Sequence, residues 1–314
     1  MTHVRRVVWL QRLAGRRRRA GDTAFAEGLY RRALAIAERH LPDDDLATAR
    51  VRNDLAVLLK YTGDFDEAAE LYAAALEVLI ARLGADDPEV ATVLHNIGGL
   101  AHAAGRPADG EAAARRAVEI RDAAVGADHP DAAADRAALA AILAATGRHG
   151  EARALLEAAL AVFESALGDD HYEVAVTLGN LAALDAQRGD QALAERRLRR
   201  ALAIKERSLG QDHLELAATL ETLGVVRRAG DTIAARELCR RALALYETAG
   251  LSTIRTSPSS KRTSTEQLRS PRQSRRTIRT PSAHRPGLHQ SSHPDPEDPT
   301  GATARPCVEA VVSS

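Results

Sequence analysis

Three Asp-His pairs recur along the sequence, and their side chains are of the types that bind metal ions. They are Asp128-His129, Asp170-His171 and Asp212-His213, each 42 residues after the one before. Zinc requires imidazole nitrogens at about 2.0–2.1 Å, whereas equivalent positions on stacked helices lie roughly 8–10 Å apart. One ion cannot bridge these pairs. We therefore predict that the three histidines cap helices and that the protein holds no metal and no other cofactor.

The two cysteines and the glycine-containing turns give no indication of catalysis. Cys239 and Cys307 lie 68 residues apart, without the spacing of a zinc module. The phosphate-binding patterns GxxxxGK(S/T) and GxGxxG are absent from the sequence, and no Ser/His/Asp arrangement is favoured. The sequence thus predicts that the protein is not an enzyme and that Cys239 is a packing residue.

Charge is divided unevenly along a chain whose net charge is zero. Residues 1–20 carry +7, residues 21–250 carry −12 and residues 251–314 carry +5. The run from Arg16 to Arg19 suits the last turn of a helix because of the helix dipole, and a contact with an acidic partner is the alternative. We do not expect a nucleic-acid partner, because the body of the chain is acidic and no aromatic residue interrupts this run.

No segment near the start of the sequence suits a membrane or an export signal. The longest apolar run there, Val7 to Leu10, is too short for a signal-peptide core or a membrane span. We therefore expect no membrane contact and a cytoplasmic protein.

The elements that position these residues follow from an internal repeat. A Gly-Asp or Gly-Arg dipeptide begins at Gly21, Gly63, Gly105, Gly147, Gly189 and Gly230, at intervals of 42 residues and finally 41. A second turn lies half a period away, in LGADDPEV (83–90), VGADHPDA (125–132), LGDDHYEV (167–174) and LGQDHLEL (209–216). A period of this length indicates stacked units, and each unit here has two segments and two turns.

Both segments of each unit are predicted to be helices, because apolar residues recur every three or four positions. Gly63 suits the left-handed position after a helix, Asp64 suits the cap of the next, and Glu67 completes a capping box. In Asp87-Pro88 and His129-Pro130, proline takes the first helical position. We predict six antiparallel helical hairpins, over about 3–40, 45–82, 87–124, 129–166, 171–208 and 213–249.

Certain positions hold the same type of residue in every repeat, and these columns of equivalent residues resemble those of a known family. A large residue recurs on the first helix and is always followed by Ala or Gly, at Leu13, Leu55, Ile97, Leu139, Leu181 and Leu223. Alanine or glycine also recurs on the second helix, where small residues let helix backbones approach closely, at Ala26, Ala68, Gly110, Ala152, Ala194 and Ala235. This pattern resembles the tetratricopeptide repeat.

Two stretches, GDFDEAAELYAAALEV (63–78) and LGADDPEVATVLHNIGGLA (83–101), are most similar to the longer-helix repeats of kinesin light chains and related bacterial proteins. The resemblance covers about residues 3–249. It implies an all-α fold, a right-handed α-solenoid of six hairpins, with residues 1–250 as the solenoid domain.

Residues 251–314 differ in composition and are predicted to form a disordered tail. They include 12 Ser, 8 Thr and 8 Pro but three Leu and no aromatic residue, which is too little apolar surface to offset chain entropy. Ser257, Ser270 and Thr280 each precede a proline, as in sites of proline-directed kinases, although chance is the favoured explanation. The change of composition near residue 250 is also consistent with out-of-frame translation of a GC-rich gene.

The resemblance also implies where a ligand binds, because ligands of this family lie along the concave face, at four positions on the first helix of each hairpin. In kinesin light chains, asparagines at two of the positions hold the backbone of an extended peptide, and Asn53, Asn96 and Asn180 occupy such positions. In the fourth hairpin all four positions are alanine. The candidate peptide-binding residues are Arg50, Asn53, Lys60, His95, Asn96, His102 and Asn180. The alternative is that they are solvated polar residues on a helix face.

We therefore expect a non-catalytic scaffold that binds an extended peptide segment in the concave groove, and the basic groove residues favour an acidic one. The alternative is a regulatory or sensor repeat module of a bacterial signalling or transcription-control system, whose effector domain is on another chain or lost. We also expect self-association through the C-terminal hairpin, because no polar capping helix follows it.

Overall fold

The structure is a computed structural model that describes residues 2–228 and 230–248, and within them all regular secondary structure is α-helical. The predicted disordered tail over 251–314, its Ser/Thr-Pro sites and Cys307 lie outside the described residues. The helices are α1 (His3–Arg19), α2 (Thr23–His40), α3 (Leu46–Thr62), α4 (Phe65–Leu83), α5 (Pro88–Ala103), α6 (Pro107–Val125), α7 (Pro130–Ala145), α8 (His149–Leu167), α9 (Tyr172–Gln187), α10 (Gln191–Leu209), α11 (Leu216–Arg227) and α12 (Thr232–Thr248).

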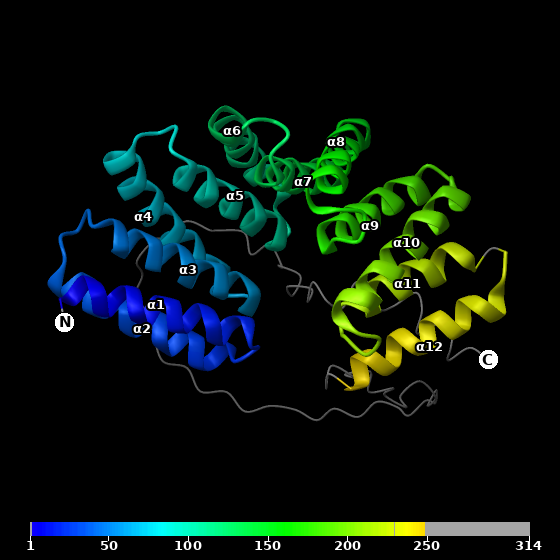
Figure 1. The fold of residues 1–314 in the computed structure, drawn as a ribbon, viewed down its shortest axis with the longest axis horizontal. Coiled ribbons are helices and arrows are strands. Elements are labelled where there is room, and N and C mark those ends of the chain that lie inside the picture. Colours follow the sequence, from blue (N-terminus) through cyan, green and yellow to red (C-terminus); the bar gives the residue numbers. More distant parts are fainter. Residues whose placement is uncertain (1, 229, 249–314) are drawn as a thin grey trace, which may run out of the picture.

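Consecutive helices pair as hairpins, from α1 with α2 to α11 with α12, and each hairpin stacks on the next. Figure 1 shows the helices following an arc, with α6 and α8 on its outer side and α7 between them on its inner side. The architecture is the all-α solenoid of stacked hairpins that the resemblance implied. No helix in the described part of the chain is long and apolar enough to cross a membrane.

The turn within a hairpin uses a glycine with a positive φ angle, as at Gly63, whose φ is 91°. The predicted capping box at this turn is wrong. The side chain of Asp64 makes no capping bond to α4, although the equivalent Asp190, with nearly the same backbone angles, does cap α10. Asp64 Oδ2 instead accepts a hydrogen bond from Thr62 Oγ1 at 2.8 Å, and Glu67 pairs with Arg31.

The turns between hairpins do carry side-chain caps. Asp87, His129 and His171 have ψ angles of 140°, 139° and 147°, and each accepts a hydrogen bond from the backbone N–H two residues later, at 2.8, 3.1 and 3.2 Å. His213 Nδ1 accepts the same bond from Glu215 at 3.3 Å. The predicted capping role is confirmed for His129 and His171, whereas His213 lies two residues before Glu215, the N-cap of α11.

The columns of small residues form the contact between the two helices of each hairpin. Ala14, Ala26, Ala56 and Ala68 are fully buried. The approach of α5 to α6 is so close that a Cβ added at Gly110 would lie 2.8 Å from Ala101 Cβ and 2.9 Å from the Gly98 carbonyl oxygen. Cys239 is buried in α12, in the position that its repeat column predicted.

Candidate functional site

The predicted peptide-binding residues lie on first helices of the hairpins. Arg50, Asn53 and Lys60 are on α3, His95, Asn96 and His102 are on α5, and Asn180 is on α9. The helices α1, α3, α5 and α7 contact one another in that order, so side chains from neighbouring hairpins can meet directly. The structure brings some of the seven residues together and leaves others apart.

Asn53 and Asn96 form a direct bridge between α3 and α5. Asn96 Nδ2 donates to Asn53 Oδ1 at 2.9 Å, and Asn53 Nδ2 donates to Asp54 Oδ1 at 3.3 Å. Gln11 Nε2 donates to Asp54 Oδ2 at 2.8 Å, which continues the contacts to α1. We call these four residues, Gln11, Asp54, Asn53 and Asn96, the amide row.

The amide row keeps groups that can bind a ligand. Each of the two asparagines uses one N–H in the row, and among the described residues the other N–H of each has no partner. Within the described residues, no side chain donates to Asn96 Oδ1. Donors and an acceptor side by side match the alternating groups of a peptide main chain.

Asp54 is the charged member of the amide row. Burial raises the pKa of its carboxyl, and the hydrogen bonds from Gln11 and Asn53, together with the positive charge of Arg18, act against that rise. Both of its oxygens already accept a hydrogen bond from the row. Asp54 therefore orients the amide groups around it.

Two cations lie beside the amide row, Lys60 of α3 and Arg18 of α1. Burial lowers the pKa of the Lys60 ammonium, and the charge of Arg18 lowers it further. In the described part of the chain Lys60 makes no ion pair, and the buried Nε of Arg18 has no hydrogen-bond partner. Lys60 Nζ lies against Gly99 of α5, where an added Cβ would be 3.4 Å away. An anionic group placed here would reduce the repulsion between the two cations.

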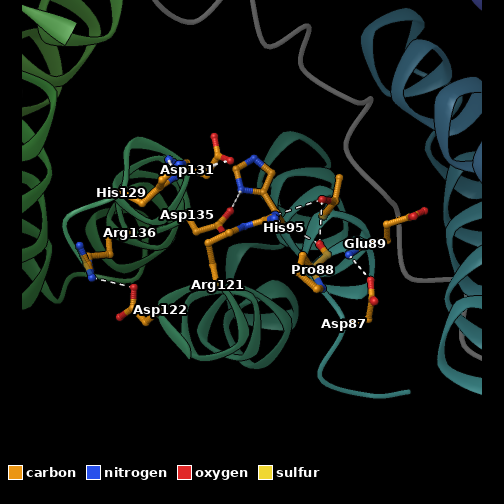
Figure 2. Close-up of polar contacts among 11 residues, drawn as sticks. Asp87, Pro88, Glu89, His95, Arg121, Asp122, His129, Asp131, Asp135 and Arg136 are labelled. Carbon is orange, nitrogen blue, oxygen red and sulfur yellow. Dashed lines mark hydrogen bonds and ion pairs between the residues drawn. The ribbon is translucent and has the colours of Figure 1, made fainter. Parts of the chain in front are cut away.

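His95 belongs to a second polar cluster, which joins α5, α6 and α7 (Figure 2). Its Nδ1 lies 2.7 Å from Asp135 Oδ1, and Arg121 Nε donates to Asp135 Oδ2 at 3.0 Å. Arg121 also donates to the Pro88 carbonyl and to Thr92 Oγ1, at 3.2 and 3.0 Å. Asp135 is only 4% exposed, so its two partners compensate a carboxylate removed from water. With Nδ1 held in this way, Nε2 is the nitrogen that His95 can offer to a ligand.

Arg121, Asp135 and the neighbouring Arg136 are not among the residues that the repeat columns predict. Arg136 is buried too, and it donates to Asp122 Oδ1 and to the Ala127 carbonyl, both at 2.6 Å. The signal for this cluster is a charge at a position where the other repeats hold uncharged residues, namely Trp9, Val51, Val93, Thr177 and Thr219. In the two ion pairs, Arg121 with Asp135 and Asp122 with Arg136, the partners are 14 residues apart in the sequence.

The other predicted residues stand apart from the amide row. Arg50 makes a two-pronged ion pair with Glu89, at 2.8 and 2.6 Å, and this bond lowers the pKa of the Glu89 carboxyl. His102 and Asn180 are exposed. Asn180 is further separated from Asn96 by α7, where the four equivalent positions are Ala137, Ala138, Ala141 and Ala144.

The chemistry available on α1, α3 and α5 is therefore that of recognition: hydrogen bonding by amides, attraction of an anion by Lys60 and Arg18, and a single oriented imidazole. Among the described residues, no group of three or more His, Cys, Asp or Glu side chains is arranged to hold a metal ion.

Comparison with known proteins gives matches along most of the described chain. The family model of the tetratricopeptide repeat matches residues 5–81, 45–123, 89–160, 132–207 and 194–248. A search of curated proteins gave no significant match.

Solved structures with a similar fold include BtubC (BKLC) from P. vanneervenii, with a TM-score of 0.56 and 22% identity over 86% of this chain and 99% of that one. A putative kinesin light chain repeat protein of Podosopora anserina has a TM-score of 0.53 and 24% identity, over 65% and 96% of the two chains. The apo form of RapI has a TM-score of 0.56 and 12% identity, over 81% and 78%. At these identities the likeness is one of fold.

Proposed function

The chain belongs to the tetratricopeptide repeat family, and from this we propose that it is a non-catalytic protein-interaction scaffold that binds an extended peptide segment along α1, α3 and α5. Repeats of this family present extended surfaces to protein partners. The proposal adds a location, the amide row, and a preference for an acidic segment.

The hydrogen bond between Asn53 and Asn96 is the observation that carries the proposal. It fixes two amide side chains from successive hairpins in one geometry before any ligand arrives, so little side-chain freedom is lost on binding. Their unused N–H groups and Asn96 Oδ1 pair with main-chain groups, which every peptide has. Such contacts give affinity without demanding one particular sequence.

The charge beside the amide row supports an acidic ligand. Lys60 and Arg18 repel each other in a half-buried place, as the lowered pKa of Lys60 reflects. A Glu or Asp side chain of the ligand would remove this repulsion and satisfy a buried donor of Arg18. We expect Lys60→Gln to weaken binding and to reduce its dependence on salt, measured by titrating a captured partner at two salt concentrations. An unchanged salt dependence would contradict the acidic preference.

The test of the location is affinity purification with mass spectrometry, using the full chain and the double variant Asn53→Ala/Asn96→Ala. Losing the hydrogen bonds of two amides should reduce recovery of the partner by about tenfold. Asn180→Ala is the matched control, because it removes an exposed asparagine of the same column type on α9. Equal helix content and equal unfolding midpoints would show that all variants fold.

Unchanged recovery of every partner by the double variant would contradict the proposed site. The identity of the partner also addresses the alternative function, since a nucleotide-binding or DNA-binding effector would favour a regulatory module.

A further inference from the structure

The outer helices of the solenoid are held to one another by ion pairs, which use up most of their charge. Arg31 of α2 pairs with Glu67 of α4 at 2.7 Å, and Arg200 of α10 pairs with Glu164 of α8 at 2.6 Å. Arg241 of α12 continues the pattern with Glu206 of α10, at 2.6 Å. The exposed faces of α1 and α4 differ from this pattern, since in the described part of the chain each carries a row of three unpaired charges of one sign.

The exposed face of α1 is a basic stripe, formed by Arg5, Trp9, Arg12 and Arg16. These residues are separated by four, three and four positions, so they follow one face of the helix. Trp9 is 55% exposed in the middle of the stripe. The side chains of the three arginines make no hydrogen bond or ion pair to any described residue.

The opposite face of α1 is the one that packs into the solenoid, through Val7, Leu10 and Ala14. The basic stripe therefore faces solvent, although it contains the chain's single tryptophan. Arg5 also lies near the N-terminal end of α1, where the helix dipole disfavours a positive charge. Stability of the helix itself does not account for this arrangement.

The exposed face of α4 is an acidic stripe with the same spacing, formed by Asp66, Glu70, Ala73 and Glu77. The three carboxylates make no hydrogen bond or ion pair among the described residues. The opposite face of α4 is buried, through Ala68, Tyr72, Ala75 and Leu79. Helices α1 and α4 do not contact each other within one chain, so neither stripe is neutralised by the other in a single molecule.

The two stripes match when the helices run antiparallel. In that register the ion pairs join Arg16 with Asp66, Arg12 with Glu70, and Arg5 with Glu77. Trp9 then lies over Ala73, so the largest side chain of one stripe meets the smallest of the other. Spacings of four, three and four are also those with which two helices pack side by side in a coiled coil.

We propose that α1 of one copy of this protein docks antiparallel on α4 of a second copy, through the basic and acidic stripes. Both complementary surfaces belong to the same chain, which favours a second copy over another anionic partner. The contact is heterologous, so an open assembly keeps one free basic stripe and one free acidic stripe at its two ends unless a ring closes. Because exposed ion pairs dominate the contact, the association is weak and falls with added salt.

The experiment is sedimentation velocity of the full chain over a range of concentrations, at low and at high salt, with the emission of Trp9 followed in parallel. We expect larger species and a blue shift of the emission at low salt, both lost at high salt. Arg12→Glu alone and Glu70→Arg alone should each weaken self-association by about tenfold or more, because one attraction becomes a repulsion.

A mixture of the two variants separates this contact from other causes. Arg12 of the Glu70→Arg chain meets Glu70 of the Arg12→Glu chain, so the mixture should associate as the unaltered protein does. Arg106→Glu and Asp128→Arg, at exposed turn residues outside both stripes, are controls of equal charge change and should associate normally. A monomer at all concentrations in low salt, or a mixture that stays as dissociated as its components, would overturn the proposal.

Discussion

At the scale of residues, the solenoid contains buried charges at positions where half of the repeats have apolar side chains. Asp135 is one, and Asp185 of α9 is another, at 1% exposure. Asp185 accepts hydrogen bonds from Arg153 of α8 and Arg197 of α10, both at 2.7 Å. The equivalent positions to Asp185 hold Leu59 and Leu143. Each carboxylate thus joins three helices through two partners, in place of an apolar contact.

We expect Asp185→Ala to lower the free energy of unfolding by about 3–5 kcal/mol, because two arginines would lose the charge that compensates them. Replacing the whole group by apolar residues that other repeats hold at these positions, as Arg153→Ala, Asp185→Leu and Arg197→Leu together, should recover most of that loss. Urea unfolding followed by circular dichroism measures both. If Asp185→Ala alone were as stable as the unaltered chain, the ion pairs of Asp185 would make no net contribution to stability.

Glu221 of α11 makes stability depend on pH. It is 3% exposed, and burial raises the pKa of its carboxyl to about 7, against a smaller opposing effect of Tyr246. The folded chain therefore holds a proton that the unfolded chain releases near pH 4.5, so stability decreases as pH rises from about 4.5 to about 7 and is level above.

Glu221→Gln should remove this part of the pH dependence and stabilise the chain above pH 7, by about 3 kcal/mol at most. Unfolding midpoints at pH 5 and pH 8 measure the effect. The same difference between the two pH values in both chains would contradict the raised pKa.

The repeat columns predicted part of the candidate site at this scale. Asn53 and Asn96 stand in columns that could be read from the sequence, and they do form the amide row. Arg50 lies next to the same face, but its guanidinium is paired with Glu89. The repeat pattern could not predict this ion pair, because the pattern shows which residues are equivalent and not which residues touch. The His95 cluster depends on Asp135, the one charged residue at its position in the repeat, and on Arg121, whose position holds a basic residue in only one other repeat, at Lys205.

At the scale of elements, the helix ends explain why one kind of cap was predictable and another was not. The turns between hairpins place Asp87, His129 and His171 in extended geometry, from which the side chain reaches the second backbone N–H of the helix. The tight turn after Gly63 leaves Asp64 at a ψ of 61°. Asp190, at a ψ of 69°, nevertheless caps α10, so the backbone angle does not decide this kind of cap. At Asp64 the side chain instead accepts a hydrogen bond from Thr62 Oγ1, which residue type alone does not indicate.

Helices α5 and α6 pack more closely than the column of alanines requires. We expect Gly110→Ala to destabilise the chain by about 1–3 kcal/mol, because the new Cβ would overlap Ala101 and the backbone at Gly98. Gly28→Ala is the matched control. Gly28 lies within α2 with no heavy atom near its added Cβ, so alanine should stabilise by about 0.5–1 kcal/mol. Thermal unfolding distinguishes the two, and an equal gain for both variants would refute the close packing.

At the scale of the whole molecule, stacking explains why so much of the fold could be predicted. Each helix contacts only helices one or two places away in the sequence, so a local repeat pattern determines nearly all of the packing. The period, the turns and the small-residue columns are sufficient for that. Contacts between molecules, such as the one proposed between the basic and acidic stripes, depend on which charged side chains remain unpaired after neighbouring hairpins have stacked. Only the structure shows which charged side chains these are.

The uneven distribution of charge along the chain is also explained at this scale. The chain has no net charge, yet its first 20 residues carry +7 and the following body carries −12. Arg18 of this basic segment joins Lys60 beside the amide row, while Arg5, Arg12 and Arg16 face outward. One basic helix therefore supplies both the inner recognition surface and the outer stripe.

The central claim, that a partner binds along α1, α3 and α5, is tested most directly by hydrogen–deuterium exchange of the full chain with and without a captured partner. We expect slower exchange in segments of α3 and α5 around Asn53 and Asn96, with α8 and α10 unchanged, and we expect Asn53→Ala/Asn96→Ala to abolish the difference. Protection confined to the outer helices, with α3 and α5 exchanging as in the free chain, would contradict the account.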